Sequence, residues 1–171
     1  MKKKDVPVEQ YASMTDNLEG ASEAFLDESA PLIGYIVHSF NDLEELLNSA
    51  VCQIINERTD VPGLVVIQKL SYSAKVDLFK RFYLMEASYL ENKRPDVDKL
   101  IERFVESGRL RNQVVHANWE GAHDDGYTRC KLKINSHGVQ HEYIQYTSES
   151  LIIIKEYIDD TYSMLDELWF E

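Results

Sequence analysis

The sequence has few cysteines and no long apolar run, and each shortage excludes a class of protein. Its two cysteines, Cys52 and Cys130, stand far apart in unrelated contexts. The chain therefore has neither a disulfide framework nor a cysteine-based metal cluster, and we expect both thiols to be inert. The longest aliphatic runs, at 64–67 and 151–154, are far shorter than the ~20 residues that span a bilayer. No membrane partner is expected.

The N-terminus has basic residues but lacks the apolar stretch of a signal peptide. Three lysines follow Met1, and Asp5, Glu9 and Asp16 come next in place of a hydrophobic segment. A secretory signal needs a hydrophobic segment after its positive residues. The sequence therefore predicts a cytoplasmic protein.

Positive charge is also scarce. The chain has 18 Lys and Arg against 30 Asp and Glu, a net charge of −12. This argues against a nonspecific nucleic-acid binder, because neutralising phosphates requires Lys and Arg. The distribution is uneven, however: residues 69–111 hold ten basic and seven acidic residues. A local positive site on an acidic body would suit the selective capture of a structured RNA.

What the sequence does contain is helical periodicity in a chain of globular composition. Its 171 residues, 44% of them hydrophobic, favour one globular domain with a core of useful size. Ser29 is expected to cap the first helix. Ser71, in the second helical region, marks either a cap or a break, so that region is one helix or two. Gly108, in the third region, allows another helix to approach closely. Apolar residues recur at helical spacing over about 29–58, 64–88, 95–117 and 148–169.

Two short strands are predicted between the third helix and the last one. Residues 127–134 and 139–146 read as strands joined by a turn at 135–138. Two strands alone are marginal, so we expect them to pack on helices. The predicted fold class is mainly α: a four-helix up-down bundle over 29–171 with a β-hairpin at about 127–146. Residues 1–28 are expected to form a polar, acidic arm, with a short helix near 22–26.

Three histidines fall in or beside the hairpin: His123, His137 and His141. His123 stands next to Asp124 and Asp125, but these residues lack paired ligands on a rigid element. We therefore expect a solvated loop there. The sequence predicts no metal site and no cofactor.

The chemistry of the sequence centres on one stretch, residues 110–119, at the end of the third predicted helix. It contains Arg111, Asn112 and His116. At ~100° per residue, Asn112 lies about 100° and His116 about 140° from Arg111 on a helical wheel. Asn112 and His116 share a face at i, i+4 spacing, and the long Arg111 side chain can reach the same cleft. The three side chains are therefore expected to line one polar site.

Arg111, Asn112 and His116 resemble the R-[N/D/H]-x3-H signature of HEPN domains, and the resemblance covers about residues 29–170. It implies a small helical bundle and a metal-independent endoribonuclease of a toxin or defence system, with Arg111 and His116 catalytic and Asn112 positioning. It further implies a homodimer in which two copies of the motif face each other, and an antitoxin or regulatory protein as a partner. HEPN toxins paired with a nucleotidyltransferase antitoxin often have tyrosine where this chain has Asn118.

These residue types suit the cleavage of RNA by its own 2′-hydroxyl. The reaction needs a base for that hydroxyl, an acid for the leaving 5′-oxygen and positive charge beside the phosphate. A guanidinium matches phosphate oxygens, and a histidine can give and take protons near neutral pH. One histidine cannot serve as acid and base in the same step, which is where a second copy of the motif would contribute.

Two other interpretations of the sequence remain open, and a third is set aside. The net charge of −12 and the lack of a basic stripe favour a non-catalytic HEPN-like module that dimerises or binds a ligand or partner. A purely structural role would have Arg111 pair with a carboxylate, Asn112 cap the next element and His116 bond a loop carbonyl. A di-metal helical hydrolase needs Glu-x-x-His pairs on facing helices, and no histidine follows a glutamate by three residues on a predicted helix.

Overall fold

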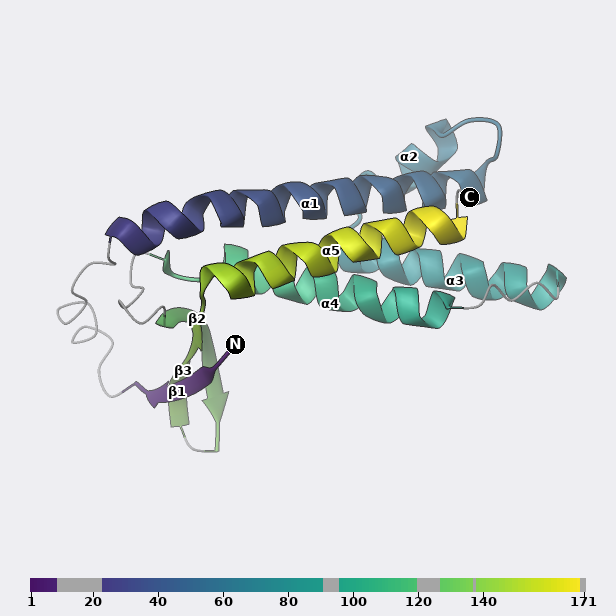
Figure 1. Ribbon diagram of the computed structural model, residues 1–171. Helices are drawn as coiled ribbons and strands as arrows, with labels where there is room; N and C mark the ends of the chain where they lie inside the picture. The colour runs from purple at the N-terminus through teal and green to yellow at the C-terminus, as the bar shows by residue number, and fades with distance from the viewer. Residues whose placement is uncertain (9–22, 91–95, 120–126, 137, 170–171) are drawn as a thin grey trace. The chain divides into compact units, whose positions relative to one another are not determined.

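The computed structural model describes residues 1–8, 23–90, 96–119, 127–136 and 138–169. In these residues the chain is mainly helical with one small sheet, as the sequence predicts. None of the helices described is long and apolar enough to cross a membrane. In chain order the elements are β1 Lys3–Pro7, α1 Glu23–Ile55, α2 Val61–Ile67, α3 Tyr72–Leu90, α4 Val97–Val115, β2 Tyr127–Asn135, β3 Gly138–Gln145 and α5 Ser148–Trp169 (Figure 1).

The chain divides into two compact units. Unit 1 comprises Met1–Val37 and Arg111–Lys155, and unit 2 comprises His38–Leu110 and Glu156–Glu171. Helices α1, α4 and α5 each contribute residues to both. The buried apolar side chains of unit 1 include Ile36, Val114, Ile144, Tyr146, Leu151 and Ile154, and those of unit 2 include Leu43, Leu47, Phe79, Leu100, Phe104 and Ile158.

Unit 1 contains a three-stranded antiparallel sheet in the order β1-β3-β2. The predicted hairpin at 127–146 is confirmed as β2 and β3, with a bulge between Arg129 and Lys131. The third strand was not predicted. Residues 3–7 of the expected polar arm pair with the edge of β3, from Lys3 opposite Ile144 to Pro7 opposite Gln140. A strand edge presents backbone N–H and C=O groups, which another strand can bond whatever its side chains are. Residues 9–22 of that arm lie outside the described residues.

Helix α1 begins six residues before the expected start, so the prediction that Ser29 caps it is wrong. Phe25 and Leu26 are half-buried and extend the apolar side of the helix toward the N-terminus. Ser29 is 1% exposed, and its hydroxyl donates to the Phe25 carbonyl at 2.6 Å. This is the local bond that serine makes inside a helix.

The second helical region consists of two helices, and Ser71 separates them. Its hydroxyl accepts from the Ala74 amide at 3.3 Å, and its carbonyl accepts from the Lys75 amide at 3.0 Å. Ser71 is therefore the N-cap of α3. Residues 59–63 fall between the first two predicted helical stretches, but Pro62 and Gly63 form the first turn of α2. Proline fits there, since its missing N–H would have no helical partner.

The buried Gly108 of α4 is a point of close approach, as the sequence indicates. A Cβ at Gly108 would lie 3.0 Å from the Tyr72 ring of α3 in the same unit. The Tyr72 hydroxyl donates to the Phe104 carbonyl at 3.1 Å. The close neighbour of Gly108 is therefore a helix of this chain.

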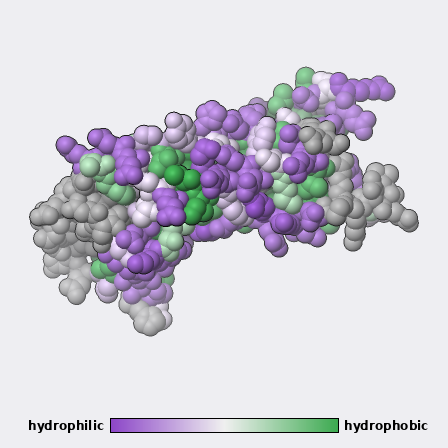
Figure 2. All heavy atoms as spheres, viewed as in Figure 1, coloured by the Kyte–Doolittle hydropathy of each residue, from purple (hydrophilic) through white to green (hydrophobic). Residues whose placement is uncertain are grey.

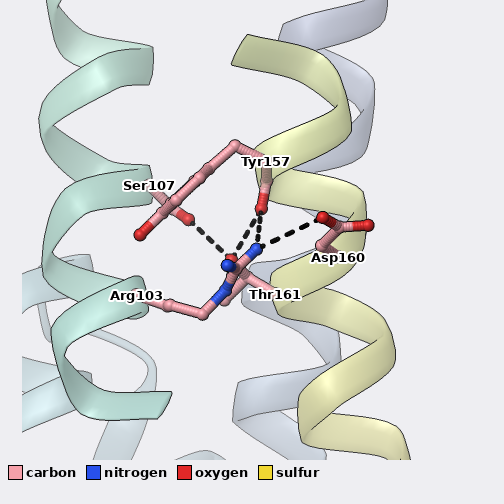
Figure 3. Close-up of polar contacts among 5 residues, drawn as sticks. All are labelled: Arg103, Ser107, Tyr157, Asp160 and Thr161. Carbon is pink, nitrogen blue, oxygen red and sulfur yellow. Dashed lines mark hydrogen bonds and ion pairs between the residues drawn. The ribbon is translucent and has the colours of Figure 1, made fainter. Parts of the chain in front are cut away.

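A polar cluster joins α4 to α5 in unit 2 (Figure 3). Arg103 donates through Nε to Thr161 Oγ1 at 3.1 Å and through one terminal nitrogen to the Tyr157 carbonyl at 2.9 Å. The same nitrogen lies 3.7 Å from the Asp160 carboxylate. The hydroxyls of Ser107 and Thr161, both fully buried, lie 3.3 Å apart. Arg103 thus satisfies buried polar groups within the fold.

Candidate functional site

Arg111, Asn112 and His116 lie at the C-terminal end of α4, in unit 1. Val114 is fully buried and anchors this turn in the unit's core. Asn112 and His116 are exposed and Arg111 is half-buried. The His116 amide donates to the Asn112 carbonyl at 3.0 Å. Helical hydrogen bonding therefore extends one residue beyond α4, and the two exposed residues share a face, as the spacing predicts.

The structure brings two of the three predicted side chains into contact. One terminal nitrogen of Arg111 donates to Asn112 Oδ1 at 3.0 Å. This bond holds the guanidinium beside the exposed face that also carries His116. Within the part of the chain that the structure describes, the imidazole of His116 makes no hydrogen bond or ion pair. It does not bond a loop carbonyl there, as the structural interpretation would require.

Two side chains cap the carbonyls at the end of α4. Trp119 Nε1 donates to the Val114 carbonyl at 2.9 Å, and the Tyr146 hydroxyl donates to the Gln113 carbonyl at 3.4 Å. The Ala117 amide also donates to Val114, at 3.3 Å. The last carbonyls of a helix lack intrahelical partners, so these donors fix the turn from which His116 projects.

The segment after His116 is held by contacts with other elements of unit 1. The Trp119 ring stacks on Phe25 of α1, with centroids 6.2 Å apart, and lies 5.0 Å from the Tyr146 ring. The Asn118 amide donates to the Arg129 carbonyl of β2 at 2.8 Å, forming an isolated antiparallel bridge. Sequence reasoning assigned no role to Trp119 or Tyr146. The nearest signal was the tryptophan that closes the stretch 110–119.

The remaining described histidines and cysteines provide weaker candidates for a functional site than the turn at the end of α4. His123 and His137 lie outside the described residues. In the described ranges no group of three or more His, Cys, Asp or Glu residues is arranged to hold a metal. Cys52 is buried, and burial raises the pKa of the Cys130 thiol, whose sulfur lies 3.7 Å from the Tyr146 hydroxyl. A raised thiol pKa disfavours the reactive thiolate.

The described residues of unit 2 contain a cavity of about 450 Å³. Ser39, Ser49, Tyr162 and Ser163 contribute hydroxyls to its lining, and Asp42, Glu45 and Asp159 contribute carboxylates. The carboxylates make it unsuited to a phosphodiester. None of the three predicted site residues lines it.

His141 of β3 is the buried histidine of the sheet, with 4% of its surface exposed. Burial lowers its pKa below the ordinary value, and the nearby Arg129 lowers it further. Folding therefore favours the neutral ring. The stability that this provides is complete above the unfolded pKa of about 6.5 and is lost as pH falls toward the lower folded value.

We accordingly expect the free energy of unfolding to fall as pH drops below about 6.5. His141→Gln, which cannot take up a proton there, should show a shallower decline. Thermal melts from pH 7.5 to 5.5 measure both slopes. If the free energy of unfolding falls equally steeply with pH in both proteins, the role of His141 is contradicted. The control is His38→Gln, which removes a histidine at an exposed position.

No family model matches this chain, and searches of curated proteins and of solved structures find no match either.

Proposed function

We propose that this protein is a metal-independent endoribonuclease of the HEPN type that acts as a homodimer in a toxin or defence context in the cytoplasm. The observation that carries the proposal is the exposed turn at the end of α4. There Arg111 is bonded to Asn112, and the His116 imidazole has no competing bond among the described residues. The proposal also includes the arrangement of the long helices: α1, α3, α4 and α5 form a HEPN-like up-down bundle.

The proposed reaction uses the 2′-hydroxyl of RNA as the nucleophile. His116 of one copy takes the 2′-hydroxyl proton, and the oxygen forms a bond to the adjacent phosphorus. The bond from phosphorus to the 5′-oxygen breaks, and the second His116 protonates that oxygen. The products are a 2′,3′-cyclic phosphate and a 5′-hydroxyl. Arg111 stabilises the negative charge that builds up on the phosphate, and Asn112 holds the guanidinium in place.

The homodimer supplies the second histidine. A two-fold interface uses the same surface on both subunits, so two exposed α4 turns facing each other would place two copies of Arg111 and His116 in one cleft. An antitoxin or regulatory protein that covers this cleft would silence the enzyme. Sedimentation at micromolar concentration tests the arrangement, because a monomer under those conditions contradicts the composite site.

The proposed activity is tested by RNA cleavage in EDTA. Wild-type protein should cut structured RNA and leave 2′,3′-cyclic phosphate ends, and 2′-deoxy substitution at the cut site should block the reaction. Arg111→Ala should lower the rate by about 10²–10³-fold, the usual loss when one donor to a developing charge is removed. Arg109→Ala is the matched control. Arg109 is exposed on the same helix and paired with Glu106 at 2.6 Å, and an exposed pair of this kind contributes little.

The second candidate is a non-catalytic module that dimerises or binds a ligand or partner. The observation that favours it is charge: the net charge is −12, and four cations of residues 69–111 are paired with acids. These pairs are Lys75–Glu44, Arg81–Asp77, Arg103–Asp160 and Arg109–Glu106. If wild-type protein leaves several structured RNAs intact in EDTA, this candidate replaces the ribonuclease.

A further inference from the structure

The unpaired positive charge of unit 1 gathers on its sheet. The three strands carry five basic residues and only two acidic ones, Asp5 and Glu142. Lys133 forms an ion pair with both acids: its ammonium lies 3.0 Å from Asp5 and 2.5 Å from Glu142. The other four basic residues form no ion pair with a described residue: Lys3, Lys4, Arg129 and Lys131. In Figure 2 the sheet's visible surface is mostly hydrophilic.

The strand register places two of these cations on the same face. Lys4 and Arg129 both lie opposite Tyr143, one from each side of the central strand. Directly opposed residues point to the same side of a sheet. Tyr127 is two residues before Arg129 and shares that face, and the Lys4 ammonium sits 3.8 Å from the centre of its ring.

The two acids lie on the other face. Asp5 and Glu142 oppose each other in the row next to that of Lys4 and Tyr143, and successive residues of a strand alternate between faces. The face with Lys4 and Arg129 therefore has two cations and no strand carboxylate. We call it the Lys4–Arg129 face.

This face begins beside the predicted catalytic turn. The Asn118 amide bonds the Arg129 carbonyl at 2.8 Å, and Asn118 follows His116 by two residues. Paired strands lie roughly 5 Å apart, and two residues span at most about 7 Å. The Cα atoms of His116 and Arg129 are therefore within about 12 Å of each other. A strand whose phosphate lies at His116 can pass over Arg129 and then Lys4.

We infer that the Lys4–Arg129 face binds the phosphodiester backbone of a single-stranded RNA segment adjoining the cleavage turn. The inference rests on the proposed function for the fate of that RNA, but binding is measured separately from cleavage. Lys4 and Arg129 contact successive phosphates, and the exposed Lys2 lies two residues before Lys4, at the N-terminal end of β1. The acidic remainder of the chain repels polyanions elsewhere, which confines binding to this site.

The test is the salt dependence of binding, in a protein that cannot cut. His116→Ala protein is titrated with a fluorescent single-stranded RNA at several salt concentrations. Each phosphate contact on a single strand contributes about 0.7 to the slope of log K against log salt. Adding Lys4→Gln and Arg129→Gln should therefore lower that slope by about 1.4 and weaken binding at low salt. Lys4→Arg with Arg129→Lys keeps the charges and should keep the slope.

A matched control removes two positive charges from unit 2. Lys80→Gln with Lys99→Gln changes two exposed lysines that form no ion pair with a described residue, and the slope should not change. An equal loss in this control would mean that net charge alone drives binding, and would overturn the inference. So would the absence of RNA binding by the His116→Ala protein. If the wild-type protein does not cleave RNA but binding still depends on Lys4 and Arg129, the proposed ribonuclease is wrong and this binding surface stands.

Discussion

Replacing His116 by alanine is expected to lower the rate of RNA cleavage by about 10²–10⁴-fold, the usual contribution of one positioned acid or base. The substitution should leave the fold intact, because the side chain is exposed and the backbone bond from its amide to Asn112 is kept. The caps at Val114 and Gln113 come from Trp119 and Tyr146 and are also unaffected. Far-UV circular dichroism and sedimentation check the fold and the dimer before rates are compared.

Mixing wild-type and His116→Ala subunits then distinguishes a composite site from two independent ones. If cleavage needs both histidines of a dimer, the activity follows the square of the wild-type fraction, because only all-wild-type dimers are active. If each subunit works alone, the activity follows that fraction linearly. At a wild-type fraction of about one tenth, the two models differ about tenfold. A linear dependence would contradict the shared cleft even if His116 itself is essential.

The sequence predicts those parts of the fold that depend on local patterns. Apolar spacing placed α4 and α5 within two residues of their observed ends, because each helix buries a regular stripe. The hairpin followed from alternation around a Gly138 turn, where φ is +98°. Strand β1 was missed because pairing with β3, more than 100 residues away, stabilises it. The early start of α1 was missed for a related reason: the Phe25 side chain is held by Trp119.

For the candidate site, the sequence identifies the side chains but not the contacts that hold them. Arg111, Asn112 and His116 were singled out by their spacing at the end of a predicted helix together with their resemblance to the HEPN signature. The capping of their helix by Tyr146 depends on where the sheet packs. Counting charges along 69–111 indicated a positive region there, but ion pairs with residues such as Glu44 neutralise part of it. The sheet cations come from strands far apart in sequence, so segment counting could not combine them.

Replacing Gly63 by alanine is expected to destabilise the fold by overpacking unit 2. Gly63 is buried in α2, and a Cβ there would lie 2.6 Å from both the Cα and the Sγ of Cys52 in α1. Cys52 belongs to the long helix α1, and its neighbour Val51 is fully buried in the core. Helix α1 is therefore fixed by its packing, and α2 has to move instead. Overpacking of this kind costs about 1–3 kcal/mol. At about 2–4 °C per kcal/mol for a chain of this size, Tm should fall by up to about 12 °C.

Gly34→Ala is the matched control, and it should shift Tm in the opposite direction. Gly34 is an exposed residue of α1 with nothing within 4 Å of an added Cβ. Alanine there gains helix propensity worth about 0.5–1 kcal/mol. The same added methyl group thus stabilises one helix and displaces another, and the difference lies in the 2.6 Å approach at Cys52. Equal melting temperatures for Gly63→Ala and wild type would mean that α2 does not pack this closely on α1.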